Sequence, residues 1–237
     1  MAAPVASWAG FYLGGNIGYG RSDGNVDVTA AVPFLLPEDG NGTLDPGSKG
    51  VIGGAQIGYN WQMGPLVTGL EADFQGSGIK GSASESKLHP RPDSTAIDGG
   101  FRSTEERLQW FGTVRGRLGL TITPDLLLYG TGGLAYGQVS NSANTRVFDN
   151  DGFTNFPVDF PASVNKVRAG WAAGGGAEWM FASKWSARIE YLHVDLGNVS
   201  AIGNQTATTA VSFSGGLVKY TWQTREDIVR AGVNYHF

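Results

Sequence analysis

Hydrophobic and polar residues alternate one by one at the C-terminal end of this chain. The apolar positions are Val229, Ala231, Val233, Tyr235 and Phe237. The intervening positions are Arg230, Gly232, Asn234 and His236. Successive side chains of a strand point to opposite faces, so a period of two marks a strand with one apolar and one polar face. The pattern predicts a final β-strand that alternates to its last residue and ends on an aromatic side chain.

The same alternation recurs in seven earlier segments, which makes eight candidate strands. The earlier segments cover about residues 10–20, 51–62, 66–76, 107–121, 126–139, 167–181 and 185–195. In the fourth segment we expect Leu108, Trp110 and Val114 to share the apolar face. The fifth segment is ambiguous in register, and one candidate outer face consists of Leu126, Leu128, Leu134 and Tyr136.

Short and long connections alternate between these segments. Segments two and three, four and five, and six and seven are separated by only a few residues, whereas long polar stretches fill about 21–50, 77–106, 140–166 and 196–224. Long connections are rare inside compact domains. Short turns on one side and long loops on the other are typical of antiparallel outer-membrane barrels. We therefore expect one all-β domain over residues 1–237, an eight-stranded antiparallel up-and-down transmembrane β-barrel with four long extracellular loops. Residues 1–8 are expected to form a short periplasmic tail. A soluble β-sandwich is the alternative.

Aromatic residues gather near both ends of the candidate strands. Those at the expected periplasmic ends are Trp8, Phe11, Trp61, Trp179, Phe181, Trp185, Tyr235 and Phe237. Those nearer the other ends are Tyr19, Phe74, Trp110, Tyr136, Trp171 and Tyr191. Two aromatic belts at the two lipid–water interfaces are expected of a membrane barrel.

Composition supports this fold and excludes several kinds of protein. Glycine accounts for 37 of the 237 residues, about twice its usual share of roughly 7%, and it recurs within the alternating segments as tight barrel curvature requires. The chain has no cysteine, and its net charge of −4 comes without a cluster of Lys and Arg. This argues against nucleic acid as a partner. No apolar stretch is long enough for a transmembrane helix. No signal peptide precedes the first strand, so we expect a mature sequence, with an intact cytosolic protein as the alternative.

Six motifs resemble the small porin-like outer-membrane proteins of alphaproteobacteria, the Brucella and rhizobial group-3 type within the OmpA/OmpX-like barrel superfamily. The motifs are WAGFYLGGNIGYG at 8–20, GGAQIGYNW at 53–61, TVRGRLG at 113–119, YGTGGLAY at 129–136, EYLHVDLG at 190–197 and VNYHF at 233–237. The resemblance implies a surface protein of the bacterial cell outer membrane. The roles that it implies include hemin binding, adhesion and envelope integrity. It does not select one of these activities, because members of the family differ mainly in their loops.

Eight charged residues fall on inward-facing positions of the predicted strands. They are Glu71, Asp73, Arg115, Arg117, Glu178, Arg188, Glu190 and Arg230. An eight-stranded barrel is just wide enough for side chains to fill it, and buried charges must be paired. We expect a salt-bridge plug in which Arg115 and Arg117 meet Glu71 and Asp73. A narrow ion or solute path lined by the same residues is the alternative. Nothing nearby resembles a nucleophile, so we expect no enzyme.

The three histidines are His89, His193 and His236, and we expect each to be an ordinary surface or lumen residue. If the loops bind hemin, His89 and His193 are the candidate ligands. No metal site or other cofactor is expected. A hydrolase needs Ser, His and an acid within mutual reach, and Ser186 and His193 lie on opposite faces of one strand.

The predicted function is therefore envelope structure and surface interaction, with a small-solute pore and loop-mediated hemin binding as alternatives. The expected partners are outer-membrane lipids, lipopolysaccharide, and host or environmental ligands at the loops. The barrel-assembly machinery is expected to recognise the C-terminal strand through Tyr235 and Phe237.

Overall fold

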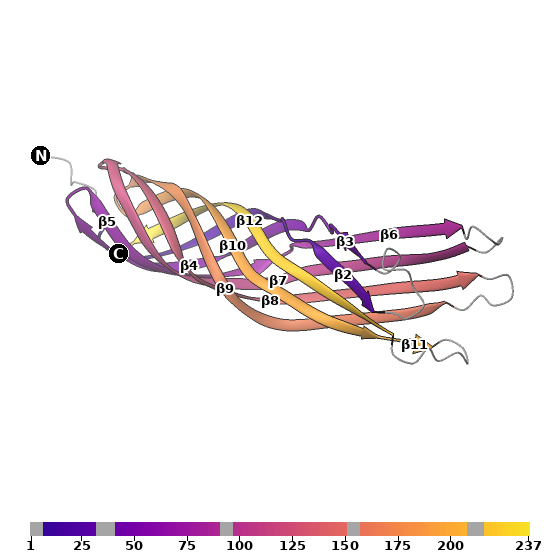
Figure 1. Cartoon of the computed structure of the whole chain (residues 1–237). Coiled ribbons are helices and arrows are strands. Elements are labelled where there is room, and N and C mark those ends of the chain that lie inside the picture. The colour runs from indigo at the N-terminus through magenta and orange to yellow at the C-terminus, as the bar shows by residue number, and fades with distance from the viewer. Residues whose placement is uncertain (1–6, 32–40, 91–96, 151–156, 208–215) are drawn as a thin grey trace, which may run out of the picture.

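A computed structural model describes residues 7–31, 41–90, 97–150, 157–207 and 216–237 of the chain. Eight antiparallel strands form a closed ring at one end of the molecule (Figure 1). In ring order they are β1 (Gly10–Ser22), β4 (Lys49–Met63), β5 (Leu66–Ser77), β7 (Ile97–Thr123), β8 (Leu126–Asn150), β9 (Val158–Ala182), β10 (Trp185–Asn204) and β12 (Leu217–His236). Pairing of β1 with β12 closes the ring, so the predicted eight-stranded barrel is confirmed.

The ring presents an apolar outer face to its surroundings. Exposed hydrophobic residues on this face include Phe11, Ile17, Val51, Ile57, Leu70, Val114, Leu118, Trp171, Ile189 and Val233. The candidate face of the fifth predicted strand is outward too: Leu134 is 69% exposed, whereas Leu127 is buried. The described residues contain no helix long and apolar enough to cross a membrane.

Leu108 does not lie on that outer face as the sequence predicted. The ladder between β7 and β8 shifts register between Leu108 and Trp110, because Gln109 is an extra residue without a partner. A bulge of this kind reverses the inside–outside parity of the strand beyond it. Leu108 is therefore buried inside, while Trp110 faces outward and stacks on Phe74.

Much of what the sequence predicted as long loops is strand. The ring strands β7, β8 and β9 continue well past the apolar band, as the long arrows in Figure 1 show. Four shorter strands join this extension: β2 (Val26–Ala31), β3 (Gly42–Leu44), β6 (Lys80–Pro90) and β11 (Thr206–Ala207). The strands β2 and β3 add to β12, and β6 pairs with β7. The extension therefore prolongs the wall of the barrel.

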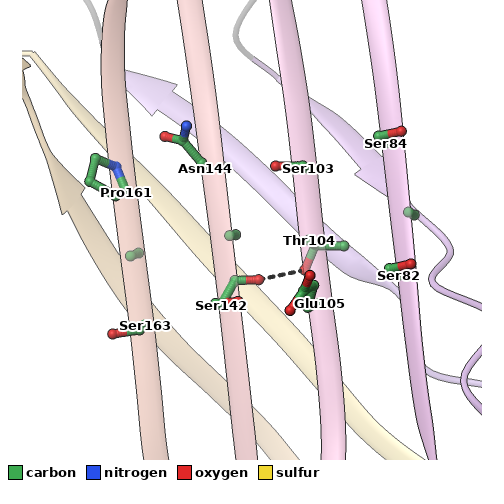
Figure 2. A pocket seen from close by; sticks show the side chains of 12 residues that line it. Ser82, Ser84, Ser103, Thr104, Glu105, Ser142, Asn144, Pro161 and Ser163 are labelled. Carbon is green, nitrogen blue, oxygen red and sulfur yellow. Dashed lines mark hydrogen bonds between the residues drawn. The ribbon is translucent and has the colours of Figure 1, made fainter.

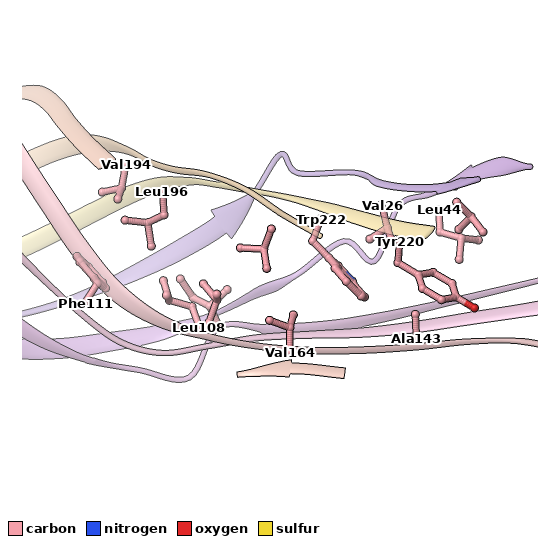
Figure 3. Packing of buried hydrophobic residues seen from close by; sticks show 14 of the residues in the cluster. Val26, Leu44, Leu108, Phe111, Ala143, Val164, Val194, Leu196, Tyr220 and Trp222 are labelled. Carbon is pink, nitrogen blue, oxygen red and sulfur yellow. The ribbon is translucent and has the colours of Figure 1, made fainter. Parts of the chain in front are cut away.

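The interior of the extension is mostly apolar, although the buried Arg102 also lies there and pairs with Glu85 at 2.9 Å. Its buried cluster includes Val26, Leu44, Ala143, Val164, Tyr220 and Trp222 (Figure 3). The Tyr220 hydroxyl donates a hydrogen bond to the carbonyl oxygen of Phe160 at 2.7 Å, and the Trp222 indole donates to Thr104 Oγ1 at 3.0 Å. Full burial of a large apolar side chain contributes about 1.5–3 kcal/mol. Apolar packing, together with hydrogen bonds to the buried Tyr220 hydroxyl and Trp222 indole, explains why these segments fold instead of remaining solvated.

We expect slow amide exchange in the extension. Amides at Ser103, Glu105 and Arg107, which lie in the β7–β8 ladder, exchange at rates comparable to those of the ring strands when the folded chain is studied in detergent by hydrogen–deuterium exchange. Exchange within seconds, as in an unstructured loop, contradicts the extended barrel.

Candidate functional site

The eight inward charges predicted from the sequence all lie inside the ring. They belong to β5, β7, β9, β10 and β12. Alternation places each of them on the inner face, and none is more than 4% exposed. Four carboxylates and four guanidinium groups share this space, so their formal charges balance.

Arg115 is the centre of the larger of two ion-pair clusters. Its guanidinium lies 2.6 Å from Glu71 Oε1, 3.0 Å from Asp73 Oδ2 and 3.2 Å from Glu190 Oε1. Arg230 joins Asp73 to Glu190 from the opposite wall, at 2.9 and 2.6 Å. Arg188 donates a further hydrogen bond to Glu71 Oε2. These six side chains therefore connect β5, β7, β10 and β12 across the interior.

Arg117 forms the second cluster, which the sequence did not predict. Its guanidinium pairs with Glu178 of β9 and not with Glu71 or Asp73. It also lies 3.6 Å from the centre of the Tyr129 ring, a cation–π contact. Parity placed Arg117 inside the barrel correctly, but the level of a residue along the axis and the reach of its side chain decide its partner.

Two tyrosines donate hydrogen bonds to carboxylates of the larger cluster. The Tyr12 hydroxyl donates a hydrogen bond to Glu71 at 2.7 Å, and the Tyr129 hydroxyl donates one to Glu190 at 3.2 Å. Gly58 on the neighbouring strand leaves room for the first ring, because a Cβ there would lie 2.3 Å from Tyr12 Cζ. The glycine-rich strands thus admit large rings beside the charges.

Trp8 closes the ring at the end with the short turns. The sequence placed it in an aromatic belt, but it is fully buried and packs in a cluster with Val67, Leu127, Tyr129 and Met180. Its indole donates a hydrogen bond to the carbonyl oxygen of Pro124 at 3.1 Å. Of the tail expected at residues 1–8, residues 1–6 lie outside the described part of the chain.

Ser186, His236 and Glu178 meet beside this closure, a grouping that the sequence reasoning missed although all three share the inward parity. Ser186 Oγ lies 2.9 Å from His236 Nε2 and donates a hydrogen bond to Glu178 at 2.5 Å. In a catalytic triad the acid orients the far side of the imidazole. Here Glu178 lies 3.7 Å from the same Nε2 atom, and Ser186 is fully buried. The arrangement therefore stabilises Glu178 and does not activate a nucleophile.

The two other histidines lie away from the interior charges. His193 Nδ1 is 2.8 Å from Asp227 Oδ1, and its ring packs on Trp171 on the outer wall. His89 lies in β6, but its side chain is outside the described part. Of the terminal residues, Tyr235 packs on Trp185 and Phe237 is 72% exposed. The described residues contain no group of three or more His, Cys, Asp or Glu side chains suited to a metal ion.

Two further buried carboxylates lie where the ring passes into the extension, beyond the apolar outer band. Glu106 and Glu226 line one cavity of about 10 Å³. Burial raises the pKa of Glu106 to about 7, although Ser48 donates it a hydrogen bond. Burial also raises the pKa of Glu226 well above its usual value, and the charge of Glu106 adds to this. Neither carboxylate forms an ion pair within the described residues, in contrast to the carboxylates inside the ring.

Comparison with known proteins gives a family and several relatives. The family model described as an outer membrane protein beta-barrel domain matches residues 1–237. The 31 kDa outer-membrane immunogenic protein of Brucella melitensis is 36% identical over 250 residues, which cover 100% of this chain and 87% of that protein. The 22 kDa outer membrane protein of Rhizobium leguminosarum is 32% identical over 81% of this chain and 66% of its own length.

A solved structure shows a weaker likeness. The outer membrane protein OprG from Pseudomonas aeruginosa is 11% identical, with a TM-score of 0.45, over 98% of this chain and 100% of that one. This level of similarity carries no argument about function.

We predict that Arg115→Ala lowers the urea midpoint of the refolded barrel. The substitution leaves Glu71, Asp73 and Glu190 without one of their cations, and stranding a buried charge costs about 3–5 kcal/mol in a dry site. Asp125→Ala in an exposed turn is the control and should leave the midpoint unchanged. Equal and negligible effects contradict the buried cluster.

We also predict that stability falls as the pH rises through the titration of Glu106. Its folded pKa of about 7 exceeds the ordinary value of 4.5. Its contribution is therefore fully present below pH 4.5 and is lost as the pH passes about 7. Glu106→Gln should remove this component, on the order of 3 kcal/mol. The measurement is the urea midpoint of the wild type and of the variant from pH 4.5 to 8.

The exposed neighbour Glu105 supplies the matched control, since Glu105→Gln changes the charge by the same amount on the outer face. Parallel pH profiles for the wild type and Glu106→Gln would show that burial of Glu106 does not affect folding stability.

Proposed function

The chain belongs to the outer membrane protein β-barrel family and lies in the bacterial outer membrane, and from that premise we propose a non-enzymatic surface protein with a closed lumen. In this proposal the barrel serves envelope structure and offers its strand extension and loops to ligands outside the cell. The C-terminal strand, with Tyr235 and Phe237, offers the assembly machinery its recognition signal.

The observation that carries the proposal is the set of ion pairs across the ring. Arg115, Arg230 and Arg188 reach carboxylates on several strands, and all the side chains involved are buried. A permeable pore needs a continuous path that solvent can reach. Here the charges neutralise one another, so the interior favours a plug over a path for solutes.

Two further layers support closure. Trp8 covers the end with the short turns, and the apolar cluster around Phe160, Tyr220 and Trp222 fills the extension. A solute moving along the axis meets an aromatic cap, a charged layer and a mostly apolar layer in turn. Neither ions nor polar metabolites are solvated in an apolar interior.

The alternatives remain a small-solute pore and hemin capture by the loops. For hemin, His193 is already engaged by Asp227 and Trp171 on the outer wall, which favours a structural role for it. Saturable hemin binding with a Soret shift, lost in His89→Ala or His193→Ala, would support capture.

We predict that the purified wild-type monomer gives no stable, large conductance steps in planar bilayers. The double variant Arg115→Ala/Arg230→Ala removes two long side chains from the interior and should produce measurable steps. Arg107→Ala/Arg225→Ala, two arginines outside the ring interior, is the matched control and should resemble the wild type. Large steps from the wild type overturn the closed lumen and favour the pore.

A further inference from the structure

Four cations form a continuous row across the outer wall. The strand registers place Arg21 opposite Lys49, Lys49 opposite Lys80, and Lys80 opposite Arg107. Directly paired residues point to the same side of a sheet, with Cβ atoms about 4.5–5.5 Å apart. All four residues are exposed. We call this set the basic row.

The protein itself neutralises the basic row only in part. Like charges directly opposite one another destabilise a sheet, and none of the four forms an ion pair within the described part of the chain. Asp227, which lies opposite Arg21, is engaged by Tyr191 and His193. The other exposed acids nearby are Asp23, whose carboxyl is within electrostatic reach of Arg21, Asp45 and Glu105. The cations at the centre of the row, Lys49 and Lys80, are therefore free to pair with an anion from outside the chain.

The basic row lies at the edge of the apolar band that is nearer the strand extension. One step toward the ring, Tyr19 lies opposite Val51 on the outer face, and both are at least half exposed. On β7, Trp110 follows Arg107 just after the bulge and packs on Phe74 and Tyr136. Aromatic residues mark the lipid–water interface. The cations are therefore at the height of the headgroups, on the side of the strand extension.

A shallow hollow of about 660 Å³ opens beside Lys80 and Arg107. Its other lining side chains are mostly small and polar, and the exposed carboxylate of Glu105 is among them. The small polar ones include Ser82, Ser140, Ser142, Ser163 and Asn165. A second hollow of about 720 Å³ shares part of this lining and continues toward the strand tips. Figure 2 shows its serine hydroxyl groups and the amide of Asn144 spread over neighbouring strands, with Glu105 among them. Hydroxyl and amide groups are hydrogen-bonding partners for sugars, and cations beside them suit phosphate or carboxylate groups.

We propose that the basic row and the adjoining serine-lined hollow bind the anionic sugar headgroup of lipopolysaccharide. The four cations span about 14 Å across four strands, which suits a headgroup that carries several negative charges. The acyl chains lie against the apolar band below, and the core sugars lie over Ser82, Ser142 and Ser163. This proposal rests on the outer-membrane placement and names the partner of one face of the barrel.

The test compares two double variants that change the net charge equally. Lys80→Gln/Arg107→Gln removes the half of the row that lines the hollow. Lys184→Gln/Lys219→Gln is the control, because Lys184 lies in a short turn at the opposite end and Lys219 lies on β12, away from the row. Each protein is refolded in phosphatidylcholine nanodiscs with a titrated fraction of purified lipopolysaccharide, and bound lipopolysaccharide is counted by native mass spectrometry.

We expect the row variant to bind lipopolysaccharide about 25-fold more weakly than the wild type. Each cation near a charged lipid surface contributes about 1 kcal/mol, which is roughly fivefold. The control variant should bind like the wild type, and dephosphorylated, carboxyl-reduced lipopolysaccharide should bind both variants equally. Equal binding of the two variants overturns the proposal. So does a soluble anionic polysaccharide that occupies the row in preference to the lipid.

Failure of this proposal is distinguishable from failure of the proposed function. A row variant that retains lipopolysaccharide while the barrel stays folded and non-conducting refutes only the binding site. A chain that conducts as the wild type refutes the closed lumen and leaves the binding result intact.

Discussion

The structure depends on pairing the charges inside a narrow ring. Eight strands enclose a space that side chains alone fill, and this chain fills it with four carboxylates and four guanidinium groups. Arg115 contacts three acids on β5 and β10, so removing it disturbs several walls at once. The burial of ions costs several kcal/mol per ion unless partners are close. Mutual neutralisation therefore couples the register of distant strands to the stability of the whole barrel.

The inner and outer faces of the barrel wall both change in polarity at nearly the same height along the barrel axis. Within the band the outside is apolar and the inside is charged, whereas in the extension the outside carries Ser82, Ser142 and Ser163 and the inside carries Phe160 and Trp222. The same antiparallel strands serve both environments because alternate positions face opposite sides. Glu106 and Glu226 lie at this transition and form no ion pair with any residue that the structure describes, and burial keeps their pKa values raised.

Alternation alone predicted all eight ring strands and the inner face of every charged residue in the two clusters. It failed at Leu108, since one bulged residue reverses parity and leaves no clear signal in the sequence. It missed the extension because Ser, Thr and Gly on the outer face resemble a loop, although Val26, Val28 and Val147 keep the inner period. The partner of Arg117 and the position of Trp8 were predicted wrongly for a different reason. Their contacts cross the interior, and local pattern carries no information about partners on distant strands.

A double-mutant cycle on Arg117 and Glu178 tests the central claim most directly, since this pair has the fewest competing ion pairs. The free energy of unfolding of Arg117→Met, Glu178→Gln and the double variant is measured by urea titration of the refolded barrel. Paired burial predicts that the double variant loses much less stability than the sum of the single losses, because neither charge is then stranded. Additive losses would contradict a barrel held together by neutralised interior charges.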